Sequence, residues 1–381
     1  MMKKCFSLLL ALCLLLTASL PALGEETAIT VTEIQKYGNL VLSLKGSDFL
    51  AMGYNYGDIV TVSLNGQELE MPVGSNFSDV DQGSMICRVV IKPDLSEDYM
   101  ILAINMGDLA TTALIAEKEK IEAAPGYVWH YKTEQPVPVS FAMKEQGGYY
   151  DQWVMHQLTR SENRADYPDL TDAAYANFRV IATTGMGENK LYRSSSPVNP
   201  EINRNKEADA AAADAGVRTF INLADNEETM KGYEGFSESY YSQQKVICLN
   251  LGVDFSAAEF QQGLAQGLRF IAENEAPYLV HCTEGKDRAG FVSALLEALM
   301  GANAEEITQD YMTTYFNYYG VEPGTEQYEA IASSNIQKSL AAALELPSIF
   351  EGDLQAAAEA YFARIGLTEA EISAVQSNLG K

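Results

Sequence analysis

Short hydrophobic runs separated by polar turns fill the first third of the chain. Runs rich in Val, Ile and Leu at residues 30–34, 40–44, 59–64 and 100–105 have the length and composition of β-strands. The pair Asn65-Gly66 between two runs is typical of a two-residue hairpin turn. The pattern predicts a small all-β domain, a barrel or a sandwich, over residues 27–116.

A change of composition follows this domain. Residues 117–138 begin with a charged run, continue with an Ala-Ala-Pro-Gly stretch and end with Pro136 and Pro138. Such a composition is typical of a linker. We therefore expect the second domain to begin at residue 139.

Beyond residue 139, strand and helix patterns alternate. Strands are predicted at residues 177–182, 191–194, 217–223, 246–251 and 278–280. Helices are predicted at residues 207–215 and 256–274, the second opened by a capping box of Ser256 and Glu259, and the chain from residue 303 on is helical. This order predicts an α/β domain over residues 139–381, with a mostly parallel sheet that binds ligands at the carboxyl ends of its strands.

The loop between the strand at 278–280 and a helix predicted from residue 289 carries the candidate chemistry. Cys282 stands near its start and Arg288 at its end, and Gly285 and Gly290 relieve crowding where the backbone curls. A loop that enters a helix directs backbone N–H groups and the positive end of the helix dipole at an anion. The same position favours the thiolate form of a cysteine, and Arg can bind two phosphoryl oxygens. The combination predicts a phosphate site with a thiolate nucleophile.

Residues 281–288, His-Cys-Thr-Glu-Gly-Lys-Asp-Arg, resemble the H-C-x5-R signature loop of the cysteine-dependent protein tyrosine phosphatase superfamily. Of the five cysteines, only Cys282 has an Arg six residues later. The Gly-Lys-Asp-Arg ending is most similar to the bacterial tyrosine-phosphatase-like branch, which includes phosphotyrosine and phosphoinositide phosphatases. The resemblance implies a tyrosine-phosphatase-like sheet flanked by helices, and a phosphoric monoester hydrolase without a cofactor. The implied substrate is a phosphopeptide, a lipid headgroup or a phosphorylated small molecule.

The resemblance also implies roles for the loop residues. Cys282 is expected to attack phosphorus, Arg288 to bind the phosphoryl oxygens, and His281 to stabilise the region of Cys282 by hydrogen bonds. The remaining residues around the phosphate are expected to bind substrate: Thr283, Glu284, Gly285, Lys286, Ala289 and Gly290. Earlier in the sequence, Arg193 either reaches the phosphate or forms a structural salt bridge, and we favour the salt bridge.

Two aspartates are candidates for the general acid. Asp254 lies 28 residues before Cys282, in a loop similar to the general-acid position of dual-specificity phosphatases. Asp287 lies inside the signature loop, at the position to which the general-acid role has been assigned in the Lys-Asp-Arg branch of the family. We favour Asp254, because its loop is free to move and leaves the phosphate site intact, but both assignments remain open.

One position departs from the family pattern. A Ser or Thr commonly follows the signature Arg and helps the thiolate leave the phosphoenzyme, whereas this chain has Ala289. The departure leaves an alternative open. The protein would then be a catalytically weak pseudophosphatase that binds phosphorylated ligands, with its N-terminal domain as an interaction module.

Residues 1–24 have the pattern of a secretory signal peptide, with Lys3 and Lys4 before an apolar run and small residues before Glu25. We expect a secreted, periplasmic or cell-surface protein with no integral membrane segment after cleavage. Cleavage leaves 24 basic against 52 acidic residues, a net charge of −28, which opposes binding to nucleic acid. An odd number of mature cysteines and only three histidines argue against a disulfide framework and a metal centre.

Overall fold

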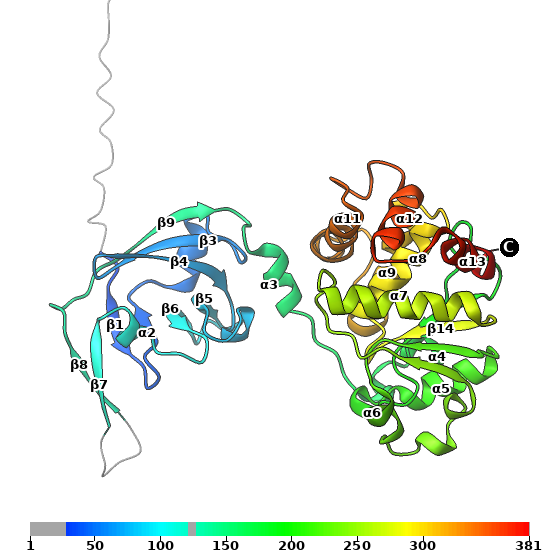
Figure 1. Cartoon of the computed structure of the whole chain (residues 1–381). Helices are drawn as coiled ribbons and strands as arrows, with labels where there is room; N and C mark the ends of the chain where they lie inside the picture. The colour runs from blue at the N-terminus through cyan, green and yellow to red at the C-terminus, as the bar shows by residue number, and fades with distance from the viewer. Residues whose placement is uncertain (1–27, 121–126, 381) are drawn as a thin grey trace, which may run out of the picture. The chain divides into compact units, whose positions relative to one another are not determined.

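The computed structural model describes residues 28–120 and 127–380 (Figure 1). The predicted signal peptide, residues 1–24, lies outside these residues. The chain divides into two compact units. The first comprises the chain up to Gly53, Val60–Met71 and Gln82–Lys144, and the second comprises Tyr54–Ile59, Pro72–Asp81 and the chain from Glu145 on.

Seven strands near the N-terminus form one curled sheet in the order β1-β2-β6-β5-β4-β3-β9. Their bounds are β1 Val31–Ile34, β2 Leu40–Leu42, β3 Ile59–Leu64, β4 Gln67–Gly74, β5 Met85–Ile91, β6 Asp98–Ile104 and β9 Val139–Glu145, with short helices α1 Gly46–Ala51 and α2 Leu109–Thr112. The outer strands also meet, because the N–H of Val31 donates to the carbonyl of Val137 and the N–H of Val139 to that of Ile29, both at 2.9 Å. The sheet therefore closes on itself, which agrees with the barrel form of the predicted all-β domain. The turn at Asn65-Gly66, with φ of 49° and 74°, joins β3 to β4 as predicted.

The segment predicted as a linker is structured where it is described. Strands β7 Ala116–Lys120 and β8 Tyr127–Tyr131 form an antiparallel ribbon, and β9 belongs to the seven-stranded sheet. The predicted boundary at residue 139 therefore falls inside this sheet. Residues 127–131, Tyr-Val-Trp-His-Tyr, are aromatic and β-branched residues that favour strands, but the prolines and charged residues around them are typical of a linker.

A five-stranded sheet organises the second unit, in the order β10-β11-β14-β12-β13. Its strands are β10 Arg179–Val180, β11 Leu191–Ser194, β12 Thr219–Asn222, β13 Lys245–Cys248 and β14 Tyr278–His281. All neighbours are parallel except β10 and β11. The predicted mostly parallel sheet is thus confirmed, with β14 in the middle.

Helices cover both faces of this sheet (Figure 1). The helices of the second unit are α3 Tyr150–His156, α4 Asp172–Tyr175, α5 Asn205–Asp214, α6 Glu227–Lys231, α7 Ala258–Glu273, α8 Asp287–Leu299, α9 Ala304–Tyr319, α10 Glu326–Ala332, α11 Lys338–Leu344, α12 Leu354–Arg364 and α13 Glu369–Leu379. Of these, α3 packs against α10. The alternating side chains of β14 face two cores: Tyr278 and Val280 join one apolar cluster and Leu279 joins another.

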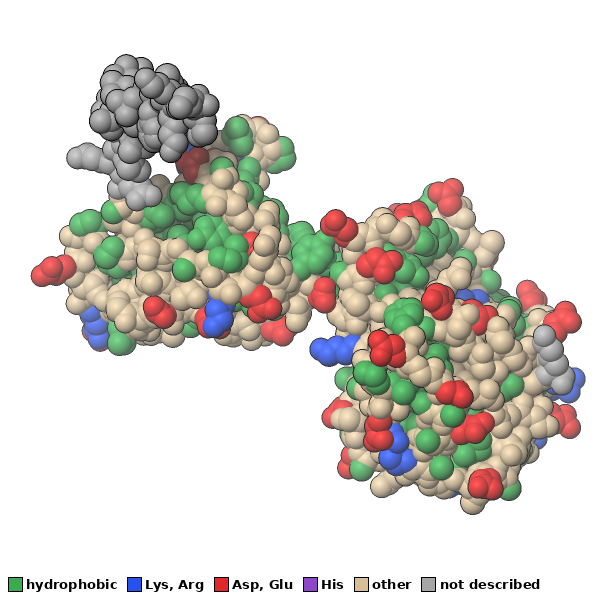
Figure 2. Space-filling model, turned by 90° about the horizontal axis from the view of Figure 1, so that it is seen from above, with side chains coloured by type: hydrophobic (Ala, Val, Ile, Leu, Met, Phe, Trp, Pro, Cys, Tyr) green, Lys and Arg blue, Asp and Glu red, His purple; other side chains and the backbone are tan. Residues whose placement is uncertain are grey.

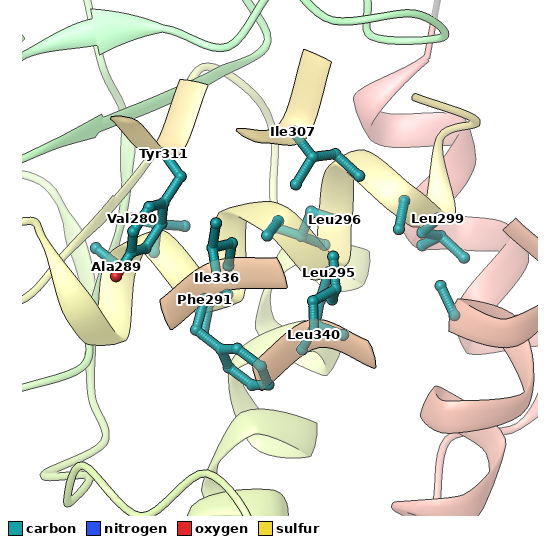
Figure 3. Packing of buried hydrophobic residues seen from close by; sticks show 14 of the residues in the cluster. Val280, Ala289, Phe291, Leu295, Leu296, Leu299, Ile307, Tyr311, Ile336 and Leu340 are labelled. Carbon is teal, nitrogen blue, oxygen red and sulfur yellow. The ribbon is translucent and has the colours of Figure 1, made fainter. Parts of the chain in front are cut away.

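Helix α8 lies in the larger cluster, where its residues 289–299 are all buried. Figure 3 shows its side chains packed with Ile307 and Tyr311 of α9 and with Ile336 and Leu340 farther along the chain. A helix buried on all sides belongs in a core, and apart from Ser293 and Glu297 these residues are apolar or Gly. The packing of residues 289–299 therefore fixes the position of the α8 N-terminus, which directly follows the signature loop.

Acidic side chains are more frequent than basic ones on the face shown in Figure 2, as the composition leads one to expect. Across residues 28–120 and 127–380, no helix is both long and apolar enough to cross a membrane. The same residues contain no group of three or more His, Cys, Asp or Glu side chains arranged to hold a metal ion. Cys87, Cys248 and Cys282 are free thiols.

Candidate active site

The signature loop lies where the central strand of the parallel sheet ends. His281 is in register with Ser194 of β11 on one side and Asn222 of β12 on the other, so the loop leaves the carboxyl edge between two neighbours. Helix α8 begins at Asp287, directly after the loop. The predicted strand, loop and helix N-terminus are confirmed.

The carbonyl groups of the loop are hydrogen-bonded to surrounding residues. Four consecutive carbonyls, those of residues 283–286, each accept a hydrogen bond. The Thr283 carbonyl accepts from the Ser196 N–H (3.1 Å), and the Glu284 carbonyl accepts from the Tyr318 hydroxyl (2.5 Å). The Gly285 carbonyl accepts from Arg193 Nη2 (2.8 Å) and Asn177 Nδ2 (3.2 Å). The Lys286 carbonyl accepts from Arg193 Nη2 (3.2 Å) and the Gly290 N–H (2.9 Å).

These bonds fix the direction of the amide groups. In a trans peptide the N–H points away from the carbonyl of the same unit, so carbonyls bonded to the surroundings leave the N–H groups of residues 284–287 facing the hollow of the loop. In the described part of the chain, the N–H groups of residues 284–289 have no acceptor. Together with the helix dipole they form a cradle for an anion.

The two glycines are required by close packing. Gly285 has φ +68°, and a Cβ there would lie 2.1 Å from the Ser194 carbonyl oxygen. A Cβ on Gly290 would lie 2.6 Å from Cε2 of Tyr311 and 2.8 Å from Nη2 of Arg193. Both were predicted as substrate-binding residues, and the structure gives them a backbone role: they let strand β11 and helix α9 approach the loop.

Cys282 and Arg288 stand at opposite ends of the cradle. Cys282 is buried, with 3% of its surface exposed. Arg288 donates from Nη1 to the Leu251 carbonyl at 2.9 Å and makes a longer contact from Nη2 to Thr283 Oγ1 at 3.4 Å. The loop after β13 therefore orients the guanidinium across the signature loop.

His281 supports the loop from the buried side of the sheet. It is fully buried, and its Nε2 lies 3.0 Å from the Tyr241 hydroxyl. Burial lowers the pKa of His281 to about 4, and the charge of Asp225 opposes this shift only in part. The ring is thus neutral at neutral pH, which fits the predicted hydrogen-bonding role.

The two candidate acids lie in different surroundings. Asp254 is exposed, and its carboxylate accepts bonds from the Ser256 hydroxyl (2.6 Å) and N–H (3.0 Å). These bonds lower its pKa. Ser256 therefore does not cap α7, whose N-cap is Ala257 without a side-chain bond, and the predicted capping box is wrong.

Asp287 differs from Asp254 in its pKa. Burial raises the pKa of Asp287, and the charge of Lys286 opposes this shift only in part; 48% of the Asp287 side chain is exposed. The Asp287 carboxyl is thus the more readily protonated of the two, and the choice between them stays a prediction.

Glu284 and Lys286 form an ion network at the edge of the cradle. Glu284 pairs with Lys286 (3.3 Å) and with Nη1 of Arg160 (2.8 Å). Burial alone would raise the pKa of Glu284, but Lys286 and Arg160 outweigh it and lower the pKa. The ammonium of Lys286 also lies 5.9 and 5.8 Å from the rings of Tyr315 and Tyr319. Arg160 was not predicted, since no local pattern links residue 160 to the loop.

Arg193 is a structural residue, as favoured from the sequence. It is fully buried, pairs with Asp310 at 2.6 Å, and donates to the loop carbonyls rather than to the hollow. Asn177, Tyr241 and Tyr318 likewise support the loop, and the sequence offered no signal for any of them.

Comparison with known proteins gives this geometry a family. The family model described as the tyrosine phosphatase family matches residues 175–381, more than half of the chain. The chain belongs to the tyrosine phosphatase family. The predicted class of phosphatase is therefore confirmed at the level of the family. No curated protein matches the chain.

Two solved structures resemble parts of this tyrosine phosphatase family member. An uncharacterized conserved protein from Thermotoga maritima is 20% identical over 30% of this chain and 35% of its own, with a TM-score of 0.22. The core catalytic domain of a PP-IP phosphatase from S. cerevisiae, in complex with citrate, is 19% identical over 45% of this chain and 95% of its own, with a TM-score of 0.27. The match thus spans about a third of the Thermotoga protein.

Proposed function

We propose that this protein hydrolyses phosphate monoesters through a phosphocysteine intermediate. The observation that carries the proposal is the set of carbonyls at residues 283–286, bonded to surrounding donors so that consecutive N–H groups converge between Cys282 and Arg288. Fixed donors stabilise negative charge without reorganising during the reaction, which is the largest single contribution in many enzymes.

In the first step, the three non-bridging oxygens of the substrate accept from the loop N–H groups and the Arg288 guanidinium. The Cys282 thiolate attacks phosphorus in line with the leaving oxygen, so the S–P bond forms while the P–O bond breaks. An alkoxide is a poor leaving group, and a proton from Asp287, or from Asp254, neutralises it. In the second step water attacks phosphorus, the carboxylate takes its proton, and the thiolate and inorganic phosphate are released.

The test compares phosphate release from an aryl phosphate by the wild type and by Cys282→Ser. The substitution should abolish turnover, because an alcohol is a far weaker nucleophile than a thiolate. It should preserve binding of inorganic sulfate, a phosphate analogue that forms no bond to sulfur, because the N–H groups and Arg288 remain. Equal turnover in both proteins would overturn the proposal. Loss of both turnover and sulfate binding would assign Cys282 a structural role.

A second candidate is a phosphate-ligand binding protein with little turnover. Ala289 favours it, because no hydroxyl stands at the residue after Arg288 to assist departure of the thiolate. In that case Cys282→Ser and the wild type would bind phosphorylated ligands alike, and neither would release phosphate beyond a single turnover.

We also propose export from the cytoplasm, supported by the signal-peptide pattern of residues 1–24. The substrate would then be a phosphorylated peptide, lipid headgroup or small molecule outside the cell or in the periplasm. N-terminal sequencing of the exported protein should begin at Glu25, and retention of the full chain in the cytoplasm would contradict this.

A further inference from the structure

A pocket of about 590 Å³ lies beside the signature loop, between residues 159–170 and the C-terminal end of α9. Its walls include Arg160, Tyr167, Asp169, Tyr318, Tyr319 and Glu322. All of these residues belong to the second unit. None of them was among the residues predicted for the site.

Two wall residues of the pocket contact the signature loop at Glu284. Arg160 binds the Glu284 carboxylate at 2.8 Å, and the Tyr318 hydroxyl donates to the Glu284 carbonyl at 2.5 Å. The ring of Tyr319 lies 5.8 Å from the ammonium of Lys286. The pocket therefore lies beside Glu284, on the side of the loop that its carbonyls face.

The charges of the pocket select for a cation. Its one basic residue, Arg160, is already paired with Glu162 and Glu284, both at 2.8 Å. Asp169 and Glu322 are exposed, and within the described residues no basic group pairs with either of them. Two carboxylates in one pocket attract a cation that enters it and repel additional phosphates.

Aromatic walls suit the shape of such a cation. Tyr167 and Tyr319 line the pocket together with Phe316, whose side chain is 41% exposed. Ring faces attract ammonium and guanidinium groups, and they also pack against the aliphatic stem of Lys or Arg. Carboxylates and rings in one pocket therefore match a long basic side chain better than a small metal ion.

We propose that this pocket binds a Lys or Arg side chain of a phosphorylated peptide whose phosphoryl group lies in the signature-loop cradle. The inference rests on the proposed phosphate site and narrows its substrate to phosphopeptides with a basic residue near the phosphorylated one. An inositol polyphosphate would bring its other phosphates towards Asp169 and Glu322, so it is disfavoured.

The test measures binding to the full chain carrying Cys282→Ser, which requires no turnover. Fluorescent phosphotyrosine peptides are made in pairs that differ only by Arg or its uncharged analogue citrulline, at successive positions on both sides of the phosphotyrosine. At one or more positions the Arg peptide should bind about fivefold more tightly, the effect of a partly desolvated cation contact. Asp169→Asn combined with Glu322→Gln should remove this difference.

The matched control is Asp214→Asn combined with Glu273→Gln, which makes the same charge change at exposed positions on α5 and α7. The control should keep the preference for Arg. The proposal would be overturned if no position showed tighter binding of the Arg peptide. It would also be overturned if this preference for Arg survived in the pocket variant or was lost equally in the control. Tighter binding of inositol hexakisphosphate than of any peptide would also overturn it. Aryl phosphate hydrolysis by the wild type tests the phosphatase proposal separately.

Discussion

Arg193 donates a hydrogen bond from Nη2 to the carbonyl oxygen of Gly285 at 2.8 Å, from the strand next to the one that carries the signature loop. The same guanidinium binds Asp310 on α9 through Nη1 at 2.6 Å. Arg179 holds the other oxygen of Asp310 at 2.7 Å. One buried ion cluster thus connects the sheet, helix α9 and the curl of the loop.

The first prediction concerns this bond. Arg193→Lys keeps the charge opposite Asp310, but one ammonium cannot reach Asp310 and the loop carbonyls together. We expect vanadate affinity and kcat/KM to fall about tenfold, since a bond worth about 1.5 kcal/mol is lost. The control is Arg218→Lys, whose side chain is 66% exposed. Unchanged vanadate affinity in Arg193→Lys would show that the loop keeps its shape without this residue.

The second prediction separates the candidate acids by their leaving groups. Asp287→Asn should slow hydrolysis of an alkyl phosphate by about 10² or more and that of an activated aryl phosphate much less, because a good leaving group needs no proton. Asp254→Asn should change both substrates little. The opposite pattern would assign the acid to Asp254, on a loop that changes conformation when substrate binds.

The pH dependence follows from the same assignment. The acid must be protonated to act, and burial raises the pKa of Asp287 above that of an ordinary aspartate. Alkyl phosphate turnover should therefore persist to higher pH than a normal carboxyl allows, and fall as pH rises through this pKa. In Asp287→Asn the descending limb should disappear from the kcat profile.

Much of the site follows from a short stretch of sequence, because its signal is local. The cradle is defined within residues 278–290 by a strand, two glycines and the start of a helix, and each of these has a recognisable sequence pattern. The residues that donate hydrogen bonds to the loop carbonyls have no such pattern. Asn177, Arg193 and Tyr318 lie between 34 and 108 residues from the carbonyls they bind. Their role depends on tertiary packing, which no local pattern encodes.

The errors in the fold have similar causes. Strand β7 reads Ala-Glu-Lys-Glu-Lys, and its four charged residues are exposed, so it lacks the apolar alternation by which strands are recognised. Ser256 has the sequence context of a helix cap, but its hydroxyl instead donates to Asp254 two residues earlier. Strand β7 instead forms through its pairing with β8, whereas at Ser256 a local hydrogen bond competes with the helix cap.

The third prediction concerns His281 and stability. Its pKa in the folded protein, about 4, is below the value near 6.5 of an unfolded histidine. The unfolded chain therefore binds more protons between these values. The stabilising effect of the neutral ring is fully present above about pH 6.5, and it is lost as pH falls towards 4, at about 1.4 kcal/mol per pH unit.

Urea unfolding across this pH range measures the effect. His281→Gln, which cannot gain a proton and retains a group for the Tyr241 hydroxyl, should show a shallower loss of unfolding free energy between pH 6.5 and 4. His130→Gln serves as the control, because the His130 side chain is 58% exposed. Parallel curves for His281→Gln and the wild type would show that other groups dominate acid unfolding.

The last prediction concerns the step after the phosphocysteine has formed. Ala289 is fully buried, in the same apolar cluster as Val280 and Tyr311 (Figure 3). Thr at this position would add a methyl group to a filled core, at about 1–3 kcal/mol, so Ala289→Ser is the cleaner substitution.

If the missing hydroxyl limits departure of the thiolate, the wild type should show a burst of aryl product followed by a slow steady rate. Ala289→Ser should raise the steady rate about tenfold, the effect of one hydrogen bond to a charged sulfur, and leave the burst rate unchanged. Ala294→Ser is the matched control, since Ala294 is equally buried in α8 but lies more than a helical turn farther from the loop. A wild type without a burst, together with an Ala289→Ser variant no faster than it, would mean that thiolate departure is not limiting, because a hydroxyl can accelerate only a step that controls the rate.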